Sequence, residues 1–262
     1  MFTWLKTTFS RTNHTYEPQP LMPRTVNITG VNFHFAMPEN FSLDMPADDL
    51  VDRVNLKEYS HLPDTRYIAL MKRWWDFYSG RPSVKNTIGT LMLSFDLIPR
   101  KKDISGSLFN YEPMVNTVYR DILNDFSDPS TENGIMEDTL LPESATSLTE
   151  FDINGRNWVI GFAGRTYHNL TTLNFYCTPI SDDWYLRARF EHSKGGGKNS
   201  GLVHRRSLGE QMRILETCEL EFLTEVPTRP PVEYEIPTGP PLTQEEIEAF
   251  NKRNDEYFSG KF

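Results

Sequence analysis

A glycine-rich stretch, SKGGGKNSG at residues 193–201, is the part of the sequence most similar to a ligand-binding loop. A phosphate-binding loop has a glycine, four residues and then Gly-Lys followed by Ser or Thr, between a strand and a helix. Here Gly197 and Lys198 precede Asn199, and His192 occupies the position of the first glycine. The helix expected downstream also begins several residues too late. The sequence therefore predicts a flexible connector here and no nucleotide site.

The other residues that could do chemistry do not form a recognisable set. His192 and His204 flank the loop, but the sequence has no HxH, HExxH or CxxC spacing that would supply a full metal-ligand set. Cys177 lies in a strand-like run rather than at a helix start, where a thiolate would be stabilised. With 36 acidic residues, close carboxylate pairs are expected anywhere and indicate nothing. We therefore predict no catalytic residues, no metal and no cofactor.

Two features favour the binding of another protein. One is a run of acidic side chains between residues 121 and 143, which is either a solvated surface or a surface complementary to a basic partner. The other is Trp74-Trp75: in a strand the two indoles face opposite sides, so that one can pack in the core and the other can anchor an interface. The candidate partner-binding residues are Trp74, Trp75, Asp125, Asp128, Glu132, Glu137 and Asp138.

Composition narrows the class of protein. The chain has 262 residues, a net charge of −9 and 13% aromatic residues, which suits a folded protein that does not bind nucleic acid. The start of the sequence lacks the long apolar run of a signal peptide or membrane helix, so we expect a cytoplasmic protein, or a periplasmic one if a leader was removed. Cys177 and Cys218 are expected as buried, reduced thiols rather than a disulfide. The oligomeric state is open.

The first half of the chain is predicted to form strands followed by a helix. TVNITGVNFHFAMP alternates apolar and polar residues with the period of a strand. RYIALMKRWWDFYSG could be a helix, but its bulky aromatic residues favour a strand paired with TIGTLMLSFDLIP. The run EPMVNTVYRDILNDF has a helical apolar stripe. That stripe consists of Met114, Val115, Val118, Ile122 and Phe126.

The second half is predicted to be mainly β-structure. FDINGRNWVIGFAG reads as a hairpin around Asn154-Gly155, because this dipeptide tolerates two positive φ angles. LTTLNFYCTPI and DWYLRARFEH are two more strands. RRSLGEQMRILET (205–217) reads as a helix with Leu208, Met212 and Leu215 on one face. CELEFL then closes the sheet as its last strand.

These elements predict an α+β fold, an antiparallel β-sheet meander with helices packed on it. We expect a flexible N-terminal arm at residues 1–24 and a core at 25–225. The core could comprise two related subdomains, 25–126 and 151–225, joined by an acidic loop at 127–150. Residues 226–262 form a proline-rich tail followed by a helix with a Thr243–Glu246 capping box, which docks on its own core or on another chain.

The order of the second-half elements resembles the PsbP-like arrangement of strands followed by a helix that returns into an edge strand. The residues concerned are NGRNWVIGFAG, LTTLNFYCTPI, WYLRARFEH and LGEQMRILETCELEF. In the first half, VNFHFAMPENFSLDMP resembles the entry hairpin of that fold. MKRWWDF with GTLMLSFDLIPR is similar to bacterial immunity and adaptor proteins of type VI secretion, and the resemblance covers residues 25–225.

This resemblance implies a non-enzymatic protein that neutralises a cognate secreted toxin effector by blocking its active site. The partner would then be a protein, with no nucleic acid or membrane involved. Two other functions stay open: an effector-loading adaptor or structural protein, and a hydrolase whose site is built from residues distant in sequence.

Overall fold

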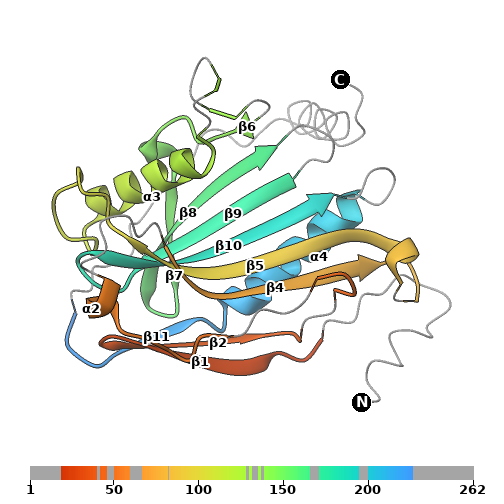
Figure 1. Ribbon diagram of the computed structural model, residues 1–262, viewed down its shortest axis with the longest axis horizontal. Coiled ribbons are helices and arrows are strands. Elements are labelled where there is room, and N and C mark those ends of the chain that lie inside the picture. The colour runs from red at the N-terminus through yellow and green to blue at the C-terminus, as the bar shows by residue number, and fades with distance from the viewer. Residues whose placement is uncertain are drawn as a thin grey trace, which may run out of the picture.

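The computed structural model has an α+β architecture of two β-sheets with helices packed against them, as the sequence predicts (Figure 1). It describes residues 19–39, 42–45, 50–59, 67–81, 83–127, 130–131, 135–136, 139–165, 171–194 and 200–226. Both core ranges, 25–126 and 151–225, contribute strands to each sheet. Their division into two related subdomains stays a prediction.

The smaller sheet has four strands in the order β11-β2-β1-β3, with β1 and β3 parallel. Its members are β1 (Met22–Ile28), β2 (Val31–Met37), β3 (Arg53–Val54) and β11 (Glu219–Phe222). β1 and β2 form a hairpin whose turn contains Gly30 at φ 79°. The sequence indicated one strand in this region, and the resemblance placed the entry hairpin one strand later. The correction follows from Gly30, since a positive φ at glycine allows the chain to reverse.

The larger sheet has seven strands in the order β4-β5-β10-β9-β8-β6, with β7 also paired to β8. All the pairs are antiparallel. Its strands are β4 (Ile68–Tyr78), β5 (Thr87–Pro99), β6 (Thr139–Leu140), β7 (Thr149–Ile153), β8 (Arg156–Arg165), β9 (Thr171–Pro179) and β10 (Trp184–Lys194). The predicted strand pairing of β4 with β5 and the hairpin at Asn154-Gly155 are both confirmed, with φ angles of 53° and 76° at the turn.

Two predictions about chain segments in this region are wrong. The strand that contains CELEFL, β11, joins the smaller sheet beside β2 instead of closing the larger one. The second part of the predicted loop 127–150 is not irregular, because it contains β6, paired with β8, and a short 3-10 helix, Ala145–Ser147. Both errors arise because pairing partners lie far apart in sequence.

Two long helices lie on opposite faces of the larger sheet, α3 in front and α4 behind in Figure 1. Short helical turns also occur at α2 (Leu56–Tyr59) and Val84–Asn86. α3 (Tyr111–Asp125) buries its predicted apolar stripe against β8 and its neighbours. The prediction for α3 is therefore confirmed.

α4 (Ser200–Leu215) differs from its prediction in both its start and its buried face. It begins five residues earlier than expected, and Leu208 and Met212 are 37% and 48% exposed. Of the predicted apolar stripe only Leu215 is buried. The inward face includes polar residues that find partners on the sheet, such as Gln211, whose Oε1 accepts a 2.8 Å hydrogen bond from Asn174 in β9. Those long-range partners decide the orientation of the helix.

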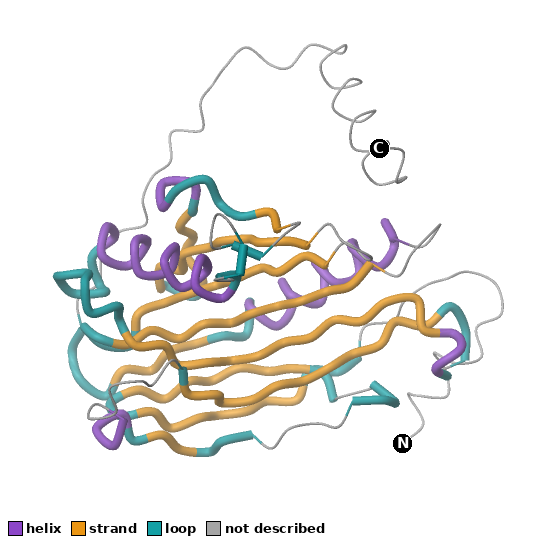
Figure 2. The backbone as a smooth tube through the Cα atoms, turned by 45° about the horizontal axis from the view of Figure 1, so that its top comes forward, coloured by secondary structure: helices purple, strands orange, loops and turns teal. Residues whose placement is uncertain are grey.

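The two sheets pack against each other, and their strands run in roughly the same direction (Figure 2). Phe33 and Phe35 of β2 meet Phe95 of β5 at ring-centroid distances of 4.9 and 4.7 Å. On this face α4 contacts β5, β10 and β2, while on the opposite face α3 contacts β8. The smaller sheet and α4 therefore cover part of one face of the larger sheet, and α3 covers part of the other face. This arrangement leaves two surfaces whose side chains can serve binding.

Cys177 and Cys218 are both buried and free, as predicted. None of the helices in the described part of the chain has the length and apolar character needed to span a bilayer.

Candidate functional site

β10 carries a row of polar side chains toward α3. Its sequence WYLRARFEH alternates, so that Leu186, Ala188 and Phe190 enter the core between the sheets, and the residues between them face the other way. The outward row is Tyr185, Arg187, Arg189 and Glu191. A charged row on a central strand is unusual unless its charges are paired.

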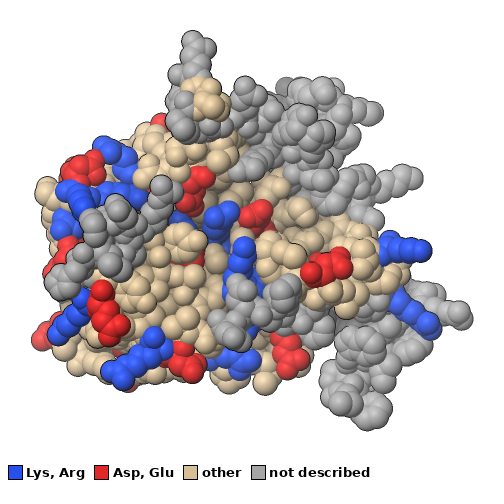
Figure 3. Space-filling view, in the orientation of Figure 1, with Lys and Arg blue, Asp and Glu red and all other residues tan. Residues whose placement is uncertain are grey.

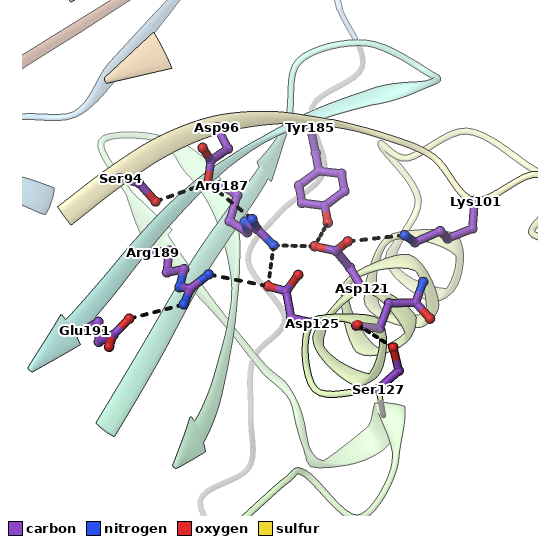
Figure 4. A network of polar contacts seen from close by, with 11 residues as sticks. Ser94, Asp96, Lys101, Asp121, Asp125, Ser127, Tyr185, Arg187, Arg189 and Glu191 are labelled. Carbon is purple, nitrogen blue, oxygen red and sulfur yellow. Dashed lines mark hydrogen bonds and ion pairs between the residues drawn. The ribbon is translucent and has the colours of Figure 1, made fainter. Parts of the chain in front are cut away.

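Arg187 is the centre of a buried ion-pair network (Figure 4). Its side chain is only 5% exposed. Nη1 lies 2.7 Å from Asp121 Oδ2 and 3.0 Å from Asp125 Oδ2, and Nη2 lies 3.2 Å from Asp96 Oδ2. α3 supplies two of these carboxylates because Asp121 and Asp125 are one turn apart, and β5 supplies the third. One guanidinium thus holds a helix, its own strand and the neighbouring strand together.

Further polar groups surround the carboxylates. The hydroxyl of Tyr185 donates to Asp121 Oδ2 at 2.8 Å, and Lys101 Nζ donates to Asp121 Oδ1 at 3.2 Å. The hydroxyl of Ser94 donates to Asp96 at 3.1 Å. Two carboxylates are therefore nearly saturated with donors, which is the condition for keeping a buried charge.

Burial and charge shift several pKa values in the network. Burial disfavours the charged form of Arg187, but Asp121 and Asp125 outweigh it and raise the pKa of Arg187 above its ordinary value. Burial also disfavours the charged form of Asp125 and so raises its pKa. The positive charge of Arg187 offsets this rise only in part. The pKa values of Cys177 and Tyr185 are well above their ordinary values, first because of burial. Cys177 is therefore a protonated thiol and a poor nucleophile at neutral pH.

The network reaches the surface along one edge. Asp125 and Arg189 lie 3.9 Å apart, Arg189 bonds Glu191 at 3.1 Å, and all three side chains are about 30% exposed. In the strand register, Glu191 is opposite Met92 of β5, and Met92 is opposite Trp74 of β4. Trp74 therefore lies on the same face as this charged edge.

Trp74 is half-buried, and Lys72 Nζ lies 5.0 Å from the centroid of its ring. We call the surface formed by Lys72, Trp74, Asp125, Arg189 and Glu191 the platform. Acidic and basic side chains are interspersed on this face of the molecule (Figure 3). The platform combines a large aromatic ring with charges that are held in ion pairs. Of its residue types, tryptophan and arginine are enriched at protein interfaces.

The structure separates the two predicted tryptophans. Trp75 is only 6% exposed, packs in the core between the sheets and donates from Nε1 to Glu39 O at 2.8 Å. Its expected role on a partner-binding surface is thereby corrected, because alternation along β4 turns it away from Trp74. Of the predicted acidic residues, Asp125 belongs to the platform. The others, Asp128, Glu132, Glu137 and Asp138, lie outside the described residues.

Sequence reasoning missed the central residue of the network. Arg187 and Arg189, two positions apart in an apolar strand, were a signal that one face of the strand carries charge. The i, i+4 spacing of Asp121 and Asp125 on the helix was a second signal. The approach of Asp96 from β5 had no signal in the sequence.

The structure describes only the two ends of the glycine-rich stretch at residues 193–201. Residues 195–199 lie outside the described residues, between the end of β10 and the start of α4 at Ser200. The helix begins at Ser200, three residues after Gly197, so the expectation that it starts several residues too late for a phosphate loop is wrong. The missing first glycine and Asn199 still argue against it. His192 and His204 do approach, with Nε2 and Nδ1 2.9 Å apart, but the described residues contain no cluster of three or more potential metal ligands.

Comparison with known proteins adds little. No family model matches the chain, and no curated protein matches it. One solved structure with a distant similarity is LpqN of Mycobacterium tuberculosis, which is involved in cell envelope biogenesis. It is 7% identical, with a TM-score of 0.35, and the match covers 76% of this chain and 91% of LpqN. A likeness this weak carries no argument about function.

Proposed function

We propose that this protein is a non-enzymatic interaction protein that binds a protein partner through the platform. In its specific form, the proposal is an immunity protein that neutralises a cognate secreted bacterial toxin effector by blocking its active site. The observation that carries it is Trp74, a large aromatic ring that lies partly exposed on a sheet face beside fixed charges. Tryptophan and arginine are the residues most often found at energetic centres of interfaces.

The fixed charges support binding in a second way. Arg189 forms an ion pair with Glu191 and lies beside Asp125. Asp125 in turn forms an ion pair with the buried Arg187. A partner that docks on such a surface orders few additional side chains, so that less conformational entropy is lost on binding. The interspersed signs also favour one complementary partner over others.

The same geometry argues against acid–base catalysis by Asp121 and nucleophilic catalysis by Cys177. Asp121 already accepts from Tyr185, Lys101 and Arg187, which leaves it little capacity to accept a substrate proton. Cys177 is fully buried and its pKa is raised. A general base or nucleophile must be able to reach its substrate in the reactive protonation state.

The first experiment identifies the partner. The tagged protein is used to capture proteins from lysate of its native cells at low and high salt, and these are identified by mass spectrometry. A single stoichiometric partner is then produced, and its affinity is measured with wild type, Trp74→Ala and Tyr67→Ala. Tyr67 is the matched control, since it is 56% exposed and lies just before the same strand.

Trp74→Ala is expected to weaken binding roughly 30-fold or more, which corresponds to at least about 2 kcal/mol, while Tyr67→Ala stays near wild type. Equal affinities for wild type and Trp74→Ala would reject the platform as the binding surface. Inhibition of the partner's toxic activity by wild type, lost in Trp74→Ala, tests the immunity function separately.

A further inference from the structure

The face of the larger sheet opposite the platform carries a group of exposed apolar side chains. The smaller sheet and α4 pack over β4, β5 and β10 on this face. Beyond α4, Phe162 of β8 is 52% exposed although its strand has neighbours on both sides. Phe151 of β7 is 54% exposed and is opposite Trp158, so it shares this face.

α4 extends the same apolar surface. Gln211 bonds Asn174, and Asn174 is directly opposite Phe162 in the β8–β9 pair. Leu208 and Met212 lie on either side of Gln211 along the helix and are 37% and 48% exposed. We call the surface formed by Phe151, Phe162, Leu208 and Met212 the α4 shelf.

An ordinary surface helix turns its apolar residues to the core and its polar residues to water. α4 buries Val203, Ile214 and Leu215 in this way, but it also leaves Leu208 and Met212 exposed while Ser207 and Gln211 are buried. Several large exposed apolar side chains on one face indicate a surface that another segment covers.

The described chain begins beside this helix. The carbonyl of Gln19, its first residue, accepts a 2.7 Å hydrogen bond from Arg213 Nη2, and Arg213 follows Met212 in α4. Eighteen residues precede Gln19, and they begin MFTWLKTTF, with five large apolar residues in nine. Trp4 and Leu5 are within 15 residues of the anchored Gln19, a span of up to about 50 Å when extended.

We propose that residues 1–18 dock on the α4 shelf through Phe2, Trp4 and Leu5. The tether at Gln19 makes the contact intramolecular, with an effective concentration on the order of millimolar, so that even weak apolar contacts hold the segment in place. The arm, expected from sequence to be flexible, then shields the apolar surface on the face opposite the platform. This inference is independent of the proposed function.

The experiment measures how fast methionines are oxidised by dilute hydrogen peroxide in the native, full-length protein. Met212 reports on the shelf, and Met45, which is 40% exposed, is the internal control. Peptide mass spectrometry gives both rates in wild type and in Phe2→Ser/Trp4→Ser/Leu5→Ser. An unchanged circular dichroism spectrum of the variant verifies the fold.

In wild type, Met212 is expected to oxidise at least fivefold more slowly than Met45, and in the triple variant the difference disappears while the Met45 rate is unchanged. Rapid oxidation of Met212 in wild type would overturn the proposal. Protection that survives in the triple variant but is lost in Ile247→Ser/Phe250→Ser would assign the shelf to the C-terminal segment instead. Protection that depends on protein concentration would assign it to a second copy.

Discussion

At the scale of single residues, Arg187 determines whether the charges around it stabilise or disrupt the fold. Its guanidinium faces three carboxylates at 2.7–3.2 Å, and its own side chain is only 5% exposed. Arg187→Met fits the space but leaves those carboxylates uncompensated. We expect a loss of about 3–5 kcal/mol in the free energy of unfolding, measured by urea denaturation. A loss below about 1 kcal/mol would contradict this account of the network.

Asp125 makes part of this stability depend on pH. Burial raises its pKa in the folded state above the ordinary value of 3.8, so the folded protein binds this proton more tightly than the unfolded chain. Its contribution to stability is therefore full below 3.8 and is lost as the pH rises through the folded pKa.

Asp125→Asn removes this titration. Relative to wild type, the variant should therefore become progressively more stable as the pH rises from about 4 through the folded pKa of Asp125. Urea unfolding of both proteins across that range measures the difference. A constant difference, or one that changes in the other direction, would show that Arg187 rather than burial dominates the pKa of Asp125.

At the scale of secondary-structure elements, glycine sets how closely α4 approaches the larger sheet. A Cβ at Gly89 of β5 would lie 2.5 Å from Val203 Cγ1 and 3.0 Å from the carbonyl of Ser193. The valine methyls cannot easily move, because a β-branched side chain has one preferred rotamer in a helix. Gly89→Ala should therefore cost about 1–3 kcal/mol of unfolding free energy.

The matched control is the same substitution on the outer side of α4. Among the described residues, nothing lies within 4 Å of a Cβ at Gly209, so Gly209→Ala should stabilise the protein by about 0.5–1 kcal/mol through helix propensity. In Gly89→Ala/Val203→Ala the clash is removed. The double variant should therefore lose less unfolding free energy than the sum of the losses caused by Gly89→Ala and Val203→Ala alone. Thermal or urea unfolding of these three variants and of Val203→Ala alone measures this, and strict additivity would argue against a clash.

At the scale of the whole molecule, the net charge of −9 should govern how fast a basic partner is captured. Charge reversal to Lys at Asp128, Glu132, Glu137 and Asp138 together is expected to slow association at least tenfold at low salt. The dissociation rate should change less, because long-range electrostatic attraction acts on the encounter of the two proteins rather than on the bound complex. Stopped-flow or surface-binding kinetics at two salt concentrations test this, and an unchanged association rate would remove the acidic segment from the interface.

The sequence by itself determined most of the local structure. Alternation in β2, the Asn154-Gly155 turn and the apolar stripe of α3 were all readable, because each depends on residues within a few positions of one another. The strand reading of β4 also predicted that Trp74 and Trp75 face opposite sides. Which of the two lies in the core needed the second sheet, which covers only one face of β4.

Only the tertiary structure decided the contacts made over long sequence separations. Arg187 meets Asp96 across 91 positions and Asp121 across 66, and nothing local to any of these residues records that proximity. The buried face of α4 was mispredicted for the same reason. Its apolar periodicity favoured Leu208 and Met212, but the buried face instead combines Val203, Ile214 and Leu215 with Gln211, which accepts a hydrogen bond from Asn174 in β9. A buried polar group must be paired, and its partner is set by the fold rather than by its neighbours in sequence.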